Sequence, residues 1–219
     1  NTRTLDRVIR RELDIVEGDA FNQVLLNISE ARVGQLGFFE DVSVEPVQGS
    51  RPDRARVQVQ VTEQPTGELA FGAGFSSTDA FLVDFSISER NLRGRGQFLR
   101  FRVSASSRRQ QVDIRFTEPR FLDRNLAAGF DLFQVRSDFS REASFETEST
   151  GFSLRAGFPL TRAVQASVSY TLRADEVRAF GAATPSIRRA AGSRVTSLFG
   201  YSLAWNRLDN PREPTNGFR

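Results

Sequence analysis

From Gly67 onward, the chain alternates between apolar residues and polar or small residues. Because successive side chains of a strand point to opposite faces of a sheet, alternation at period two predicts strands rather than helices. One face of the first four predicted strands carries Leu69, Phe71, Ala73, Phe75, Phe81, Val83, Phe85, Ile87, Leu99, Phe101, Val103, Val112, Ile114 and Phe116. We predict about eight strands, at residues 68–76, 80–88, 97–106, 111–117, 126–135, 151–158, 163–173 and 195–205.

The opposite face of these strands carries charge well inside each segment. The charged positions are Asp84, Arg100, Arg102, Asp113 and Arg115. Strands of about nine to eleven residues span a bilayer when tilted, and an apolar exterior with a polar interior is typical of a transmembrane β-barrel. We therefore predict that these charges face a lumen and that lipid contacts Phe71, Phe85, Phe101, Phe116, Val168 and Tyr201. The simplest role of the charged side chains is solvation and cross-strand pairing, and each pair is worth about 0.2–1 kcal/mol. A role in selectivity is the alternative.

Composition limits the remaining choices. The chain has 219 residues, enough for one or two domains, with 39% hydrophobic residues and a mean hydropathy of -0.37. A soluble β-sandwich would fit this hydropathy, but so does a barrel, because only every second residue faces lipid. Cys and His are both absent, which excludes disulfides, thiolate metal sites, Ser-His-Asp catalysis and the common zinc sites.

The chain shows no catalytic or nucleic-acid-binding pattern. Its 30 cationic residues are all Arg, scattered and balanced by 27 acidic residues, so we predict no nucleic-acid role. Asp175 and Glu176 are adjacent in a predicted loop and indicate a solvated surface rather than an acid–base pair. Gly72 and Gly74 lie within an alternating strand with no helix after them, which argues against a nucleotide loop. We predict no enzymatic activity and no cofactor.

Residues 1–64 follow a different pattern. Leu5, Val8, Ile9 and Leu13 recur at helical spacing, and a second amphipathic helix runs to Leu36, with Asp19 as its expected cap and Gly37 as its stop. Strands follow at residues 39–46 and 55–61. This order predicts a small α+β domain that lacks an opening strand, with a core drawn from Val8, Ile9, Leu25, Ile28, Leu36, Val57, Val59 and Val61.

Both ends of the chain have the character of a cut. It begins at Asn1 rather than Met, without a signal peptide, and it stops at Arg219 in what reads as another strand. We expect a piece of a longer protein. If residues 1–64 are periplasmic, turns at 77–79, 107–110, 137–148 and 175–192 point outward, and those at 89–96, 119–125, 159–162 and 208–217 point inward.

Several short motifs, in order along the whole chain, resemble the BamA-type family of outer-membrane assembly proteins. The segments 1–12, 18–19, 36–39 and 61–63 resemble a POTRA domain, a periplasmic repeat of that family. Residues 89–96 resemble its N-L-x-G-x-G turn, and residues 117–122 its T-x-P-x-F turn. Residues 210–217 resemble N-P-x-x-P-T-x-G, with Asn216 where Arg is more usual.

The resemblance implies a mixed fold: a POTRA-like α+β domain at residues 1–64, then the first half of a transmembrane antiparallel β-barrel of about sixteen strands at residues 65–219. It implies an outer-membrane location with residues 1–64 periplasmic, and a precursor that bears a signal peptide. The lumen-inserted loop of the family would lie beyond Arg219.

The resemblance also implies a mechanism of strand addition. Unfolded outer-membrane clients would pair with an edge strand at Phe39, Val42 and Val44. They would enter the bilayer through a seam at the first barrel strand, the lateral-gate strand, at Leu69, Phe71, Gly72, Gly74 and Phe75. The implied partners are these clients, accessory assembly lipoproteins and the lipid bilayer. A sibling POTRA-barrel transporter that secretes a partner protein and a passive porin-like channel are the alternatives.

Overall fold

The computed structural model describes residues 2–51, 54–77, 80–161 and 163–207. The chain divides into two compact units. The first contains residues 1–67 and, from further along the sequence, residues 89–97; the second contains residues 68–88 and the chain from residue 98 onward. The predicted turn at 208–217 and its N-P-x-x-P-T-x-G motif lie outside the described residues.

The first unit has the predicted order of helix, helix, strand and strand. Helices α1 (Asp6–Arg10) and α2 (Gln23–Gln35) precede strands β1 (Phe39–Gln48) and β2 (Ala55–Glu63), which pair antiparallel. The expected cap was wrong. The side chain of Asn22 accepts hydrogen bonds from the N–H groups of Val24 and Leu25, whereas Asp19 accepts one from Val16 in the preceding loop.

The core of the first unit is formed by Val8, Ile9, Val33, Phe38 and Phe39, against which Leu13, Leu36, Val42, Val59 and Val61 pack. Helix α2 buries Leu26, Ser29 and Val33, whereas Ile28 is 38% exposed, so the predicted face of this helix was wrong by about one residue. Leu25 and Val57 are half-buried. Ser29 is tolerated inside because its hydroxyl donates to the Leu25 carbonyl and accepts from the Asp14 N–H.

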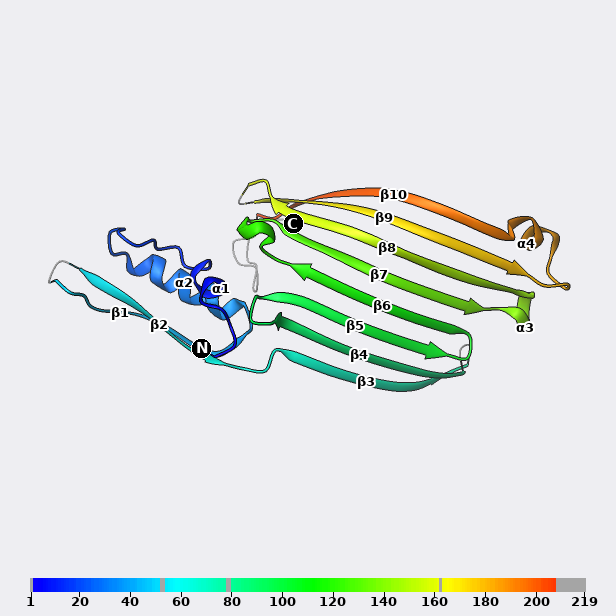
Figure 1. Ribbon diagram of the computed structural model, residues 1–219, viewed down its shortest axis with the longest axis horizontal. Coiled ribbons are helices and arrows are strands. Elements are labelled where there is room, and N and C mark those ends of the chain that lie inside the picture. The colour runs from blue at the N-terminus through cyan, green and yellow to red at the C-terminus, as the bar shows by residue number, and fades with distance from the viewer. Residues whose placement is uncertain (1, 52–53, 78–79, 162, 208–219) are drawn as a thin grey trace. The chain divides into compact units, whose positions relative to one another are not determined.

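The second unit is one antiparallel sheet of eight strands, each paired with its neighbours in the chain (Figure 1). The strands are β3 (Gly67–Ser76), β4 (Ala80–Leu92), β5 (Gln97–Ser106), β6 (Arg109–Glu118), β7 (Ala127–Asp138), β8 (Phe145–Pro159), β9 (Val164–Ala179) and β10 (Gly192–Trp205). Short helices α3 (Ser140–Ala143) and α4 (Pro185–Ala190) lie at one end of the sheet, and η1 (Phe121–Asp123) lies at the other. Among the described residues β3 and β10 do not pair, so this sheet is not closed.

Strands β8, β9 and β10 are longer than predicted. Parts of the predicted loops are strand. In the loop at 137–148, β7 runs to Asp138 and β8 begins at Phe145. In the loop at 175–192, β9 continues to Ala179. Sequence alternation missed these extensions because the face that is apolar in the rest of the sheet becomes charged here, at Glu146, Glu148, Glu176 and Arg178. Ion pairs Arg136–Glu146 and Arg178–Glu176 lie there instead of apolar side chains.

The register of the sheet separates the two predicted faces. Apolar residues stand directly opposite one another from β5 to β10, in the row Leu99, Phe116, Phe130, Leu154, Tyr170 and Phe199. The rings of Phe116 and Phe130 stack at 5.5 Å. The neighbouring row contains Arg100, Arg115, Asp131, Ser153 and Thr171, on the opposite face. Among the described residues, no helix is both long enough and apolar enough to cross a bilayer.

Candidate functional site

Cross-strand ion pairs organise the polar face of the sheet. Arg102 donates to the Asp84 carboxylate through Nε (2.9 Å) and Nη2 (2.7 Å). Asp131 accepts from Arg115 Nε at 2.7 Å and from Arg155 Nε at 2.6 Å. The predicted charges therefore share one face, opposite the apolar row that contains Phe116 and Phe130. Sequence reasoning did not single out Arg155, although its place two residues after Ser153 puts it on the same face.

A shallow hollow of about 340 Å³ lies on this polar face. Its polar lining includes Arg100, Arg102, Gln111, Asp113 and Arg115. Gln111 donates to the Asp113 carboxylate at 2.8 Å. One guanidinium contacts Asp84 and two contact the single carboxylate of Asp131, so the face is polar, as the interior of a transmembrane barrel is.

Strand β3 is the terminal strand of the sheet among the described residues. Its apolar side chains are strongly exposed, at 70% for Leu69, 72% for Phe71 and 82% for Phe75. A Cβ at Gly72 would meet only Asp84, at 3.9 Å, and a Cβ at Gly74 would meet nothing within 4 Å. The two glycines are therefore not forced by crowding, and they leave β3 with fewer side-chain contacts than another residue would give.

Strand β1 is the other predicted binding edge. Its Val44 N–H does not point at β2 but donates to the Glu30 carboxylate of α2 at 3.3 Å. Two residues along, Pro46 has no N–H to offer. Because residues two apart in a strand direct their N–H groups to the same edge, these two positions offer an incoming strand no free donor. Phe39 and Val44 themselves are buried and Val42 half-buried.

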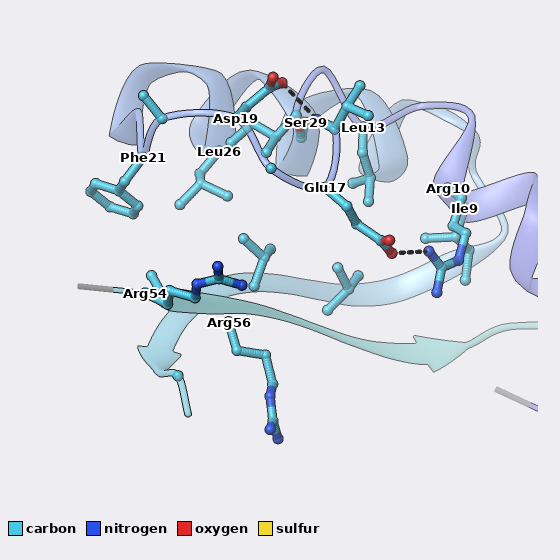
Figure 2. A pocket seen from close by; sticks show the side chains of 18 of the residues that line it. Ile9, Arg10, Leu13, Glu17, Asp19, Phe21, Leu26, Ser29, Arg54 and Arg56 are labelled. Atoms are coloured by element: carbon cyan, nitrogen blue, oxygen red, sulfur yellow. Dashed lines mark hydrogen bonds and ion pairs between the residues drawn. The ribbon is translucent and has the colours of Figure 1, made fainter. Parts of the chain in front are cut away.

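A groove of about 1100 Å³ follows β2 within the first unit (Figure 2). Residues from both faces of β2 line it, including Val59 and Gln60, whereas no residue of β1 does, so the groove lies along the edge of β2 that β1 leaves unpaired. In Figure 2, Ile9, Leu13 and Leu26 lie on the helical side, and the Arg10–Glu17 ion pair spans part of it at 3.1 Å. This is the edge beside which an opening strand is expected.

The turn that resembles N-L-x-G-x-G packs within the first unit. The side-chain amide of Asn91 donates to Thr4 Oγ1 and accepts from the Gly96 N–H, both at 2.8 Å. The Leu5 N–H donates to the Gly94 carbonyl at 2.8 Å. Gly94 and Gly96 both have φ of +70°, as tight-turn glycines do. A Cβ at Gly94 would lie 1.8 Å from the Arg3 carbonyl oxygen, so no other residue fits there.

Glu89 and Glu63 extend these contacts. Glu89 accepts from Thr66 Oγ1 at 2.5 Å and from the Asn91 N–H at 2.7 Å. The Glu63 carboxylate accepts from the N–H groups of residues 2, 3 and 4, at 2.6–3.1 Å. We call Thr4, Glu63, Thr66, Glu89 and Asn91 the anchor network. The sequence predicted a tight turn at residues 89–96. It did not predict the hydrogen-bond partners of the turn, because the bonded residues lie 23 to 87 positions apart in the sequence.

The anchor network fixes the charge of Glu63. Burial by itself would raise the pKa of this carboxyl, but the hydrogen bonds from Thr4, Thr2 and Arg3 outweigh it and lower the pKa to about 2. Glu63 is therefore ionised throughout the physiological range. In the described part of the chain, no group of three or more carboxylates is placed to hold a metal ion.

Two family models match the chain. The Omp85 superfamily domain matches residues 91–219, and POTRA, described as a surface antigen variable number repeat, matches residues 1–64. The chain belongs to the Omp85 superfamily. The POTRA match ends at residue 64, just before β3, whereas the Omp85 match begins at residue 91, near the end of β4.

Relatives within the Omp85 superfamily align along the whole chain. The outer membrane protein assembly factor BamA of Neorickettsia risticii is 30% identical over 100% of this chain and 30% of its own length. BamA of Nitratidesulfovibrio vulgaris is 29% identical over 99% of this chain and 27% of its own length. The chain thus spans about a third or less of these relatives.

Solved structures share the fold. The crystal structure of BamA from Haemophilus ducreyi lacking POTRA domains 1–3 matches with a TM-score of 0.74 and 21% identity, over 99% of this chain and 44% of that one. CdiB from Acinetobacter baumannii matches with a TM-score of 0.53 and 14% identity, over 88% of this chain and 38% of that one. The open eight-stranded sheet corresponds to part of a barrel in this family.

Proposed function

We propose that the chain is the part of an outer-membrane protein assembly factor that receives unfolded β-barrel clients and starts their insertion at a lateral seam. Membership in the Omp85 superfamily places the protein in the outer membrane, with residues 1–64 in the periplasm. The observation that carries the proposal is an exposed, glycine-bearing terminal strand, β3, in a sheet whose faces are divided between apolar and charged side chains.

The physical basis is the cost of unpaired backbone in hydrocarbon. An N–H or C=O group without a partner costs several kcal/mol in the bilayer core. If β3 separates from the barrel's final strand, its free edge becomes a template on which a client strand recovers those hydrogen bonds. Gly72 and Gly74 lower the cost of separation, because they contribute no side-chain contacts across the seam. The proposed step exchanges hydrogen bonds only: no covalent bond is made or broken, and the step needs no cofactor.

The first unit would deliver the client. The unfolded client would first pair with β1 by strand addition, at Phe39, Val42 and Val44. The contact between Glu30 and the Val44 N–H implies that this edge is covered at rest, and that a client strand must displace the carboxylate. Accessory assembly lipoproteins are further proposed partners.

Reconstitution tests the proposal. The full-length protein is placed in liposomes with an unfolded barrel client and a periplasmic chaperone, and folding of the client is followed by its resistance to protease and its shift in electrophoretic mobility. We expect the protein to raise the initial rate of client folding about tenfold or more over empty liposomes. A rate equal to that of empty liposomes would refute the proposal.

A sibling transporter that secretes a partner protein is the second candidate, because the fold is shared with CdiB. The same liposomes discriminate between the two. A secreted substrate would accumulate in the lumen as soluble, protease-protected protein, whereas an assembly client stays in the membrane. A passive porin-like channel would conduct ions and accelerate neither process.

A further inference from the structure

The described part of the chain has four buried polar residues, and three of them meet at one place. Thr4, Thr66 and Asn91 are 5%, 7% and 8% exposed, and all belong to the anchor network; Ser29 is the fourth. Burying a polar side chain is costly unless it is hydrogen-bonded, and a fully bonded network specifies a single geometry. Because three of these four buried polar residues lie in the anchor network, we infer that this network has a function that depends on a fixed geometry.

Asn91 joins two segments that are distant in the sequence. Its Nδ2 bonds to Thr4 and its Oδ1 to Gly96, so one side chain holds both the start of the first unit and the far side of the β4–β5 turn. The Leu5 N–H and the Gly94 carbonyl close a second link beside it. An alanine at position 91 makes neither side-chain bond, and an aspartate keeps the acceptor for Gly96 but has no amide hydrogen to donate to Thr4.

Glu89 joins the turn to the residue that precedes the main part of β3. It accepts from Thr66 Oγ1 and from the Asn91 N–H, and the Arg90 N–H donates to the Thr66 carbonyl at 3.2 Å. Thr66 is thus held through both its side chain and its backbone. By contrast, the body of β3 from Leu69 to Phe75 is exposed throughout and has a single neighbouring strand among the described residues.

We propose that Asn91 and Glu89 are positioning residues that fix the base of β3 at Thr66, so that residues 69–75 exchange strand partners while residues 66–67 stay in place. This inference rests on the proposed function, in which β3 is the lateral-gate strand. A fixed base keeps the register of β3 constant during opening. Register matters because a slip of one residue would turn Leu69, Phe71 and Phe75 from the apolar face to the polar one.

The test combines amide hydrogen exchange with the liposome assay on the full-length protein. The variants are Thr66→Val and Thr4→Val, which keep the side-chain shape, together with Asn91→Ala. Thr62→Val and Asn27→Ala are the matched controls, since both residues are exposed on the same unit. We expect Thr66→Val and Asn91→Ala to raise the exchange of amides 66–69 about tenfold or more, with the controls near wild type.

A conservative pair separates positioning from a general loss of structure. Glu89→Gln retains an oxygen that can accept both hydrogen bonds, whereas Glu89→Ala has none. We expect Glu89→Gln to keep exchange and client folding within about twofold of wild type. We expect Glu89→Ala to lower the folding rate at saturating client about tenfold, with the half-saturating client concentration unchanged, because client capture takes place at β1.

The outcomes are distinct. Wild-type exchange at amides 66–69 in Thr66→Val and Asn91→Ala would overturn the inference, and so would faster exchange with undiminished client folding. If wild-type protein folds no client at all, the proposed function fails; unchanged exchange in the variants would then refute the fixed base separately.

Discussion

The ring of Phe133 lies against Gly151, its direct partner across the β7–β8 pair. A Cβ at Gly151 would be 2.7 Å from Phe133 Cζ and 2.6 Å from the Leu172 carbonyl oxygen. An aromatic ring that covers a cross-strand glycine supplies packing that the glycine lacks. Because Gly151 has no side chain, the Phe133 ring can occupy the space above it on the polar face of the sheet.

Gly151→Ala should therefore destabilise the barrel. The added methyl group meets backbone as well as ring, so we expect a loss of about 1–3 kcal/mol, typical of overpacking. The measurement is the unfolding midpoint of the full-length protein in detergent. Gly181→Ala is the matched control, because a Cβ there has nothing within 4 Å. Equal midpoints for the two variants would show that the ring and the carbonyl can move aside at no cost.

Glu63 should make the stability of the first unit depend on pH. Its pKa is about 2 in the folded chain against a usual 4.5, so its stabilisation is complete above pH 4.5 and disappears as the pH falls toward 2. Urea unfolding, followed by a fluorophore on a cysteine at Asn27, should give separate midpoints for wild type and Glu63→Gln at pH 6. The two should converge as the pH approaches 2. Glu40→Gln, an exposed change on β1, should not reproduce the difference; parallel curves for Glu63→Gln and wild type would contradict the role of Glu63.

Glu30 should limit access to β1. Glu30→Ala releases the Val44 N–H and should raise photo-crosslinking of an unfolded client to β1 about two- to fivefold, as expected for removing a competing hydrogen bond. Val44→Pro removes that donor altogether and should weaken crosslinking. Glu40→Gln on the same strand is the control. Lower crosslinking in Glu30→Ala would mean that the carboxylate helps to bind the client instead of covering the edge.

Period-two alternation predicted the sheet and the division of its faces, because the opposed rows through Phe116 and Arg115 follow directly from side-chain parity. It failed at 145–148 and 175–179, where the strands continue but the otherwise apolar face carries Glu146, Glu148, Glu176 and Arg178. It also misplaced the buried face of α2, since adjacent Leu25 and Leu26 allow two faces, and the buried one contains the polar Ser29, which is satisfied by two hydrogen bonds.

The candidate sites were harder to predict from the sequence than the fold was. The hydrogen bonds from the Val44 N–H to Glu30 and from Asn91 to Thr4 join residues of different elements. No local sequence pattern predicts such bonds. The glycines at 94 and 96 did signal a tight turn. That Gly94 is also required by the nearby Arg3 carbonyl depends on tertiary packing alone.

A reversible lock on β3 tests the central claim most directly. The 219 residues contain no cysteine, and Gly74 has open space for a side chain. A cysteine there and one at the facing residue of the barrel's final strand would close the seam in the full-length protein, with Gly74→Cys alone as the control. We predict that the oxidised double variant stays folded in the membrane but loses client folding in liposomes, and that a reductant restores it. Client folding at the wild-type rate with the disulfide intact would contradict the gate.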